Sequence, residues 1–115
     1  MDRATQILIV GATPDSDALA ELLRLEGYKV AQAARSELVV AASAYRPRLV
    51  IADVAFPQTE GLELLHQLQA IERKPRTILV SSRPSAALEP LGVTCLGKPV
   101  DLPVLWRLLN CADAA

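Results

Sequence analysis

The stretch Leu49-Val50-Ile51-Ala52-Asp53 is a continuous apolar run that ends on a carboxylate. Runs of this kind, rich in β-branched residues, are typical of strands in a parallel sheet whose two faces are covered by helices. Ile7-Leu8-Ile9-Val10 and Ile78-Leu79-Val80 have the same character. Two weaker runs, Val30-Ala31-Gln32-Ala33 and Val93-Thr94-Cys95-Leu96, suit the edges of such a sheet. The sequence therefore predicts five strands, of which three are central.

The segments between these runs have helical periodicity. Thr13 and Pro14 give the first helix an N-cap and a first-turn proline, and Gly27 ends it. A second helix is expected over residues 37–45, and Asp101 caps the last one. Because strands alternate with helices, we predict a single α/β domain over residues 1–115, with a parallel, doubly wound sheet. The stripes expected to face the sheet are Leu19, Leu22 and Leu23 in the first helix, Leu62, Leu65, Leu68 and Ile71 in the third, and Leu102, Leu105, Trp106 and Leu109 in the last.

The connection between the fourth and fifth strands is too short for a regular crossover. Only residues 82–92 separate them, whereas a parallel crossover usually takes about a dozen residues or more, most of them helical. Pro84 can begin a helix, but Pro90 has to end it or follow it. We therefore expect a shortened or missing fourth helix, with one helical turn at most, near Ser85 to Leu88.

The composition excludes several classes of protein. A net charge of -1, with no run of lysine and arginine, argues against direct binding of nucleic acid. No stretch reaches the length of a membrane span, and the first residues do not resemble a signal peptide. Cys95 and Cys111 lack the spacing of metal ligands and are expected to be reduced thiols. We expect a cytoplasmic protein that does not bind membranes.

Polar residues follow several of the predicted strands. Asp53 ends the third strand, Ser81 ends the fourth, and Gly97-Lys98-Pro99 follows the fifth, whereas Gly11 and Ala12 follow the first. The carboxyl ends of parallel strands meet at one edge of the sheet, which is where such folds place their functional sites. A carboxylate, a hydroxyl and an ammonium should therefore converge there. We expect Asp53 and Lys98 to form an ion pair, with Ser81 hydrogen-bonded to it.

The chain resembles the response-regulator receiver domains of two-component signalling over nearly its whole length. The matching segments, in the order and spacing of the family, are residues 7–10, 22–30, 46–53 with Pro57, 61–65 and 97–102. The resemblance implies a flavodoxin-like receiver sheet with strand order 2-1-3-4-5. It also implies that Asp53 is the phosphoacceptor, that Ser81 and Lys98 bind phosphoryl oxygens, and that the Lys98–Pro99 bond is cis.

Three departures from the family pattern concern the phosphorylation switch. Gly11 and Ala12 replace the two acidic residues that hold magnesium in the family, and one carboxylate is a poor cage for that ion. Cys95 stands where the family has its aromatic switch residue, and the fourth helix of the output face is shortened. Asp15 or Asp17 could supply a further ligand, but the favoured interpretation is that both stabilise the first turn of a helix. We therefore expect no magnesium cofactor.

These departures predict a pseudo-receiver, which is not an enzyme and acts by binding proteins. Its expected partner is a signalling protein, a histidine kinase or a second copy of the chain. The shortened crossover is expected to expose an apolar surface for this partner, formed by Leu88, Leu91, Val93 and Trp106. The alternative is a working receiver phosphorylated on Asp53 by a histidine kinase. A third hypothesis is a small anion bound near Gly11 and the start of the first helix.

Overall fold

A five-stranded parallel sheet forms the centre of the molecule in the computed structural model, which describes residues 6–11, 13–71 and 74–114, the last four by their backbone alone. The strand order is β2-β1-β3-β4-β5, as the resemblance implied, and the two weakly apolar strands lie at the edges. The strands are β1 (Ile7–Val10), β2 (Val30–Ala33), β3 (Leu49–Asp53), β4 (Arg76–Ser81) and β5 (Val93–Gly97).

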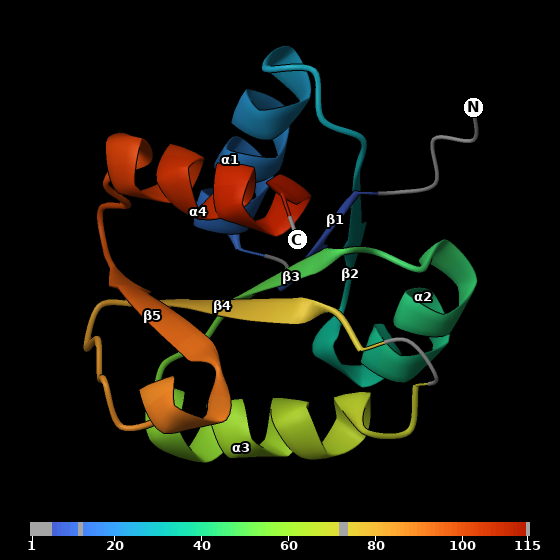
Figure 1. Cartoon of the computed structure of the whole chain (residues 1–115), viewed down its shortest axis with the longest axis vertical. Coiled ribbons are helices and arrows are strands. Elements are labelled where there is room, and N and C mark those ends of the chain that lie inside the picture. Colours follow the sequence, from blue (N-terminus) through green and yellow to red (C-terminus); the bar gives the residue numbers. More distant parts are fainter. Residues whose placement is uncertain (1–5, 12, 72–73, 115) are drawn as a thin grey trace.

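Helices cover both faces of this sheet, and each face has its own hydrophobic core (Figure 1). α1 and α4 pack on one face, and α2 and α3 pack on the other. None of the helices in the described part of the chain is both long and apolar enough to span a bilayer. The helices are α1 (Pro14–Leu25), α2 (Leu38–Tyr45), α3 (Pro57–Leu68) and α4 (Leu102–Ala114), with the 3-10 turns η1 (Arg35–Glu37) and η2 (Glu89–Leu91).

The helix-end signals in the sequence are confirmed. The Thr13 hydroxyl accepts a hydrogen bond from the backbone N–H of Ser16 at 3.1 Å, and Pro14 opens α1. Gly27 follows α1 with a φ of +98°, which favours glycine. Asp101 accepts a hydrogen bond from the N–H of Val104 at 3.3 Å, as expected for the cap of α4. Local sequence signals therefore fix where these helices begin and end.

The fourth crossover contains no α-helix, as predicted, but the position of its single turn was wrong. The turn is η2 at Glu89–Leu91, instead of the expected Ser85 to Leu88, and Pro90 lies inside it. Proline is tolerated there because the first residues of a helical turn need no N–H donor. The side chain of Leu88 is buried just before the turn and fills part of the space that a helix would occupy.

The side of α3 that faces the sheet differs from the side that the sequence predicted. Its buried residues are Pro57, Gly61, Leu64 and Leu68, whereas Leu62 is exposed. The reason is Gly61, which lets the side chains of two leucines approach the helix. A Cβ at Gly61 would lie 2.4 Å from a δ-carbon of Leu88 and 2.8 Å from one of Leu79. Close packing at a glycine therefore sets the orientation of this helix.

The interaction surface predicted from the sequence was wrong as a set. Leu88 and Val93 are buried in the core beneath α2 and α3. Trp106 is partly buried and packs against the core on the opposite face of the sheet. Leu91 is the one residue of the four that is largely exposed. These four side chains cannot form one surface, because the sheet separates Trp106 from the others.

Candidate functional site

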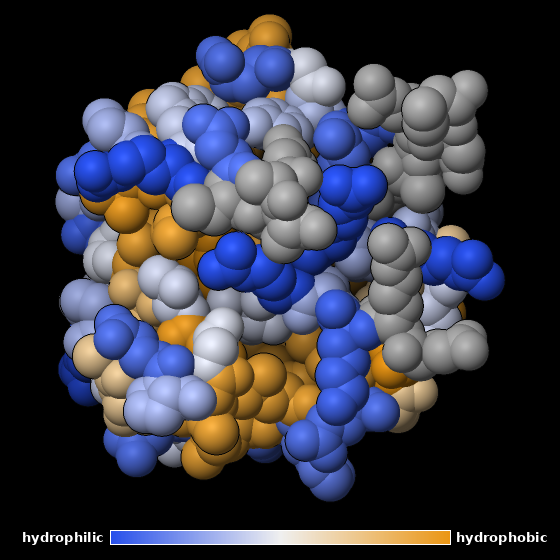
Figure 2. Space-filling model, in the orientation of Figure 1, coloured by the Kyte–Doolittle hydropathy of each residue, from blue (hydrophilic) through white to orange (hydrophobic). Residues whose placement is uncertain are grey.

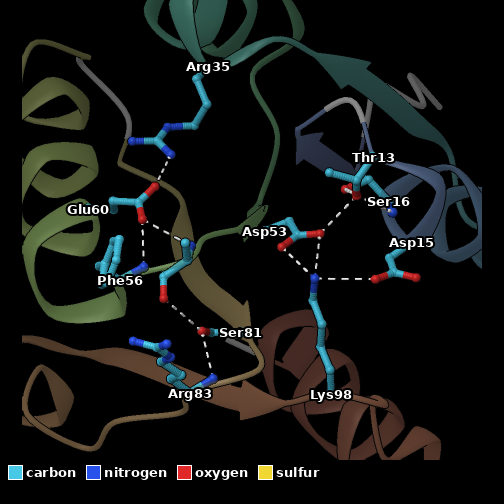
Figure 3. Close-up of polar contacts among 11 residues, drawn as sticks. Thr13, Asp15, Ser16, Arg35, Asp53, Phe56, Glu60, Ser81, Arg83 and Lys98 are labelled. Carbon is cyan, nitrogen blue, oxygen red and sulfur yellow. Dashed lines mark hydrogen bonds and ion pairs between the residues drawn. The ribbon is translucent and has the colours of Figure 1, made fainter.

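Asp53 and Lys98 meet at the carboxyl edge of the sheet, at the ends of β3 and β5. The Lys98 ammonium lies 2.8 Å from Oδ1 of Asp53 and donates a hydrogen bond of 2.9 Å to Oδ2 (Figure 3). The side chains are 13% and 26% exposed, so the pair is shielded from bulk water. The Lys98–Pro99 peptide bond is cis, as the resemblance implied. The predicted ion pair is confirmed.

The start of α1 brings two further side chains to this pair (Figure 3). The Thr13 hydroxyl donates a hydrogen bond to Oδ2 of Asp53 at 2.9 Å. Lys98 Nζ also donates to Oδ2 of Asp15, at 3.3 Å. Asp17, in contrast, accepts a hydrogen bond from Gln32 at 2.9 Å. Asp15 stands in the first turn of α1, as the favoured interpretation expected, and it also contacts Lys98, which the sequence analysis did not anticipate.

The charges of this site are arranged around one ammonium. The hydrogen bond to Asp53 raises the pKa of Lys98, desolvation opposes this effect, and Asp15 adds to the increase. Lys98 therefore remains protonated at neutral pH. An apolar pocket of about 530 Å³ adjoins the site between α1 and the Lys98–Leu102 segment. Because two carboxylates and one ammonium line its polar end, the charge there disfavours the small anion of the third hypothesis.

Gly11 has a backbone conformation that restricts which residues can stand at its position. Its φ is +135°, a value that L-residues with a side chain rarely adopt. A Cβ added there would lie 3.0 Å from Oγ of Ser16 and 3.5 Å from Cβ of Asp53. The backbone therefore resists an acidic side chain at position 11. Ala12, the other position of the missing acidic pair, lies outside the described residues.

The side chains around Asp53 offer few of the oxygen ligands that magnesium requires. Magnesium prefers octahedral coordination by oxygen atoms. The part of the chain that the structure describes contains no group of three or more His, Cys, Asp or Glu side chains that could hold a metal. The two carboxylates present, Asp15 and Asp53, both contact the Lys98 ammonium. A divalent cation would have to displace that ammonium, so this arrangement does not fit magnesium.

Ser81 lies near the site but bonds elsewhere. Its side chain is fully buried at the end of β4. Its hydroxyl accepts a hydrogen bond of 3.0 Å from the N–H of Arg83 and lies 3.5 Å from the carbonyl oxygen of Ala55, to which it donates. No hydrogen bond joins it to Asp53 or Lys98 among the described residues, so that expectation was wrong. Ser81 instead connects the two loops that follow β3 and β4.

Cys95 occupies the position that the sequence analysis assigned to the family's aromatic switch residue. It lies in β5 opposite Leu79 of β4 and is a free, partly buried thiol. Its side chain packs against the core beneath α2 and α3. A small side chain in this position fills core space and is too short to swing toward Ser81 as a large aromatic ring would.

Glu60 fixes the loop that follows Asp53, and the sequence analysis missed it. One oxygen of Glu60 accepts hydrogen bonds from the N–H groups of Ala55 and Phe56, at 2.9 and 2.6 Å. The other oxygen accepts one from Arg35, which follows β2 (Figure 3). Burial alone would raise the pKa of Glu60, but these hydrogen bonds, led by that from Arg35, lower it. An acidic residue in the first turn of α3 was the available sequence signal.

Glu60→Gln is expected to lower the free energy of unfolding by about 1–2 kcal/mol at neutral pH, because hydrogen bonds to a charged group are lost. A lowered carboxyl pKa contributes stability above the ordinary value of 4.5, and this contribution disappears as the pH falls through the lowered value. The difference between wild type and variant should therefore shrink in acid. Urea denaturation at several pH values tests this. Glu63→Gln is the control, because Glu63 is exposed and lies 3.8 Å from the same arginine.

The comparisons with known proteins decide the family. The profile described as response regulator receiver domain matches residues 7–110. The chain belongs to the response-regulator receiver family. Members of this family are signalling modules that interact with histidine kinases and other signalling proteins. The comparison with curated proteins finds no significant match.

Solved structures of receiver domains superpose on nearly the whole chain. A CheY-like response regulator receiver domain from Methylobacillus flagellatus is 27% identical, with a TM-score of 0.76 and coverage of 95% of this chain and 98% of the other. The receiver domain of the hybrid histidine kinase CckA is 28% identical, with a TM-score of 0.73 and coverage of 93% and 97%. The pseudo-receiver domain of the CikA protein is 23% identical, with a TM-score of 0.69 and coverage of 95% and 97%, and this likeness concerns the fold alone.

Proposed function

We propose that this receiver domain transmits signals by binding other proteins, without ordinary magnesium-dependent phosphorylation of Asp53. The observation that supports this proposal is the position of the Lys98 ammonium between the carboxylates of Asp53 and Asp15. In phosphoryl transfer a divalent cation neutralises the charge that develops on the moving group. Here a lysine already neutralises the acceptor. The proposed partners are a histidine kinase or another cytoplasmic signalling protein, and nucleic acid is not among them.

The second candidate is a working receiver that is phosphorylated on Asp53. The observation that favours it is Asp15, which adds a second carboxylate beside Asp53 although the family's acidic pair is missing. In this case an oxygen of Asp53 would attack the phosphorus of a phosphohistidine or of acetyl phosphate. The products would be an aspartyl phosphate and the released histidine or acetate.

Incubation with acetyl phosphate and millimolar magnesium separates the two candidates, and intact-mass spectrometry is the readout. We expect no phosphoryl adduct, and no change in the amide NMR spectrum on addition of beryllofluoride. A receiver with both acidic residues serves as the positive control, and Asp53→Asn shows whether any adduct lies on Asp53. A stable adduct that requires Asp53 and magnesium would establish the second candidate and refute the first.

A further inference from the structure

One face of the sheet lacks the helix that each other crossover supplies. The crossovers before β2, β3 and β4 contain α1, α2 and α3, whereas the one before β5 contains only η2. On the face covered by α2 and α3, the space beside α3 is therefore filled only by the loop carrying Leu88 and η2 (Figure 1). The side of α3 that points toward β5 lacks a helical neighbour in the described part of the chain.

A groove lies at this place, between α3 and the amino ends of β4 and β5. Its volume is about 580 Å³, and its apolar wall includes Leu62, Leu65 and Leu91. Leu62 is 47% exposed and Leu91 is 58% exposed, although both are large hydrophobic side chains. Figure 2 shows a hydrophobic patch in the lower half of the molecule, over α3 beside η2, with hydrophilic side chains around it. This surface suits an apolar partner.

A buried hydroxyl in the lining of the groove has no partner. Thr77 lies near the start of β4 and is 4% exposed. Within the described part of the chain, its Oγ1 is the one buried side-chain polar atom without a hydrogen bond. Buried polar groups in folded proteins almost always have partners, because leaving one unsatisfied is costly. This hydroxyl is already excluded from solvent, so it belongs to the floor of the groove and is not itself a contact offered to a partner.

The rim of the groove is basic. Lys74 and Arg76 line it together with His66, and all three side chains are exposed. None of them forms an ion pair with a residue that the structure describes. The described residues that line the groove include no carboxylate. Its charge therefore complements an acidic partner.

We propose that this groove binds an amphipathic acidic helix of a partner protein. Leu62 and Leu65 are three residues apart on α3 and present the ridge against which a second helix packs. Leucine-like side chains of the incoming helix contact this ridge and Leu91, and its flanking carboxylates contact Lys74 and Arg76. The proposal rests on the proposed function in taking protein contact as the output. It does not depend on whether Asp53 accepts phosphate.

The probe is a synthetic helical peptide of about 18 residues, with leucines along one face and glutamates on both sides of it. Fluorescence anisotropy measures its affinity for the intact chain, and amide NMR shifts locate it. We expect saturable binding, with shifts concentrated at Leu65, Thr77 and Leu91. Leu91→Glu and Arg76→Glu should each weaken binding by about tenfold or more. A peptide with lysines in place of the glutamates should bind the wild-type chain more weakly by a similar factor.

Matched controls use the opposite face of the sheet. Leu25→Glu and Arg107→Glu change exposed side chains of α1 and α4 and should leave the affinity unchanged. No binding at about 1 mM peptide, equal binding of the lysine peptide, or shifts centred on α1 and α4 would overturn the proposal. The proposal would also be overturned if the chain alone formed a dimer and Leu91→Glu dissociated it, since a second copy would then occupy the groove. An adduct on Asp53 would refute the proposed function and leave the groove result unaffected.

Discussion

Gly11→Asp is expected to lower the free energy of unfolding by about 2–3 kcal/mol and to leave magnesium affinity low. The substitution restores an acidic residue where the family has one. However, the φ of +135° strains any L-residue with a side chain, and the new Cβ would lie 3.0 Å from Oγ of Ser16. For a domain of this size such a loss corresponds to a fall of about 8–12 °C in the melting temperature. Urea denaturation and magnesium titration measure the two effects.

Gly27→Asp is the matched control for this experiment. Gly27 has a φ of +98°, but nothing lies within 4 Å of the position of its added Cβ. The control therefore carries backbone strain without a steric contact, and it should cost about 1 kcal/mol. If Gly11→Asp proved as stable as wild type and bound magnesium tightly, the backbone would not be what keeps this site from holding the ion.

The sheet and its edges could be predicted because each strand is a short run of consecutive residues whose apolar character can be recognised in the sequence. Leu49-Val50-Ile51-Ala52-Asp53 is apolar up to its last residue, so both the burial of the strand and the position of the carboxylate at its end follow from the pattern alone. The face of α3 could not be obtained in this way. Periodicity predicts that the face carrying most leucines is buried. The orientation of α3 is instead decided by Gly61, because the absence of a side chain there leaves room for Leu88 from a distant loop.

The candidate site, too, could be predicted from the sequence only in part. Asp53 ends β3 and Lys98 follows β5 at the same edge of the sheet, with only β4 between the two strands, so their meeting follows from topology. Asp15 and Asp17 both stand in the first turn of α1, and sequence alone does not distinguish them. The packing of α1 on the sheet directs Asp15 toward Lys98 and Asp17 toward Gln32. The contact between Glu60 in the first turn of α3 and Arg35 in η1 joins elements far apart in the sequence, so no local pattern predicts the partner of Glu60.

Lys98→Met is expected to destabilise the domain by about 2–3 kcal/mol at neutral pH. Removing one partner of a buried ion pair leaves the other charge uncompensated, and partial exposure of both side chains moderates the cost. The raised pKa of Lys98 gives the sign of the pH dependence. The pair's contribution is complete below the ordinary lysine pKa of about 10.4 and disappears as the pH rises through the raised value. The wild type and the variant should therefore converge only in strong alkali.

A double-mutant cycle assigns this loss to the charge pair. In Asp53→Asn with Lys98→Met, one of the two uncompensated carboxylates is gone, so we expect the double variant to be more stable than Lys98→Met alone. Denaturation of the four proteins gives the coupling energy between the two side chains.

Magnesium supplies an independent test, because a cation that binds only the folded state raises its stability. If the Lys98 ammonium of the wild type occupies the position that a cation would take, millimolar magnesium should stabilise Lys98→Met more than wild type. Equal stabilisation of both proteins would place the ion elsewhere and contradict this role of Lys98.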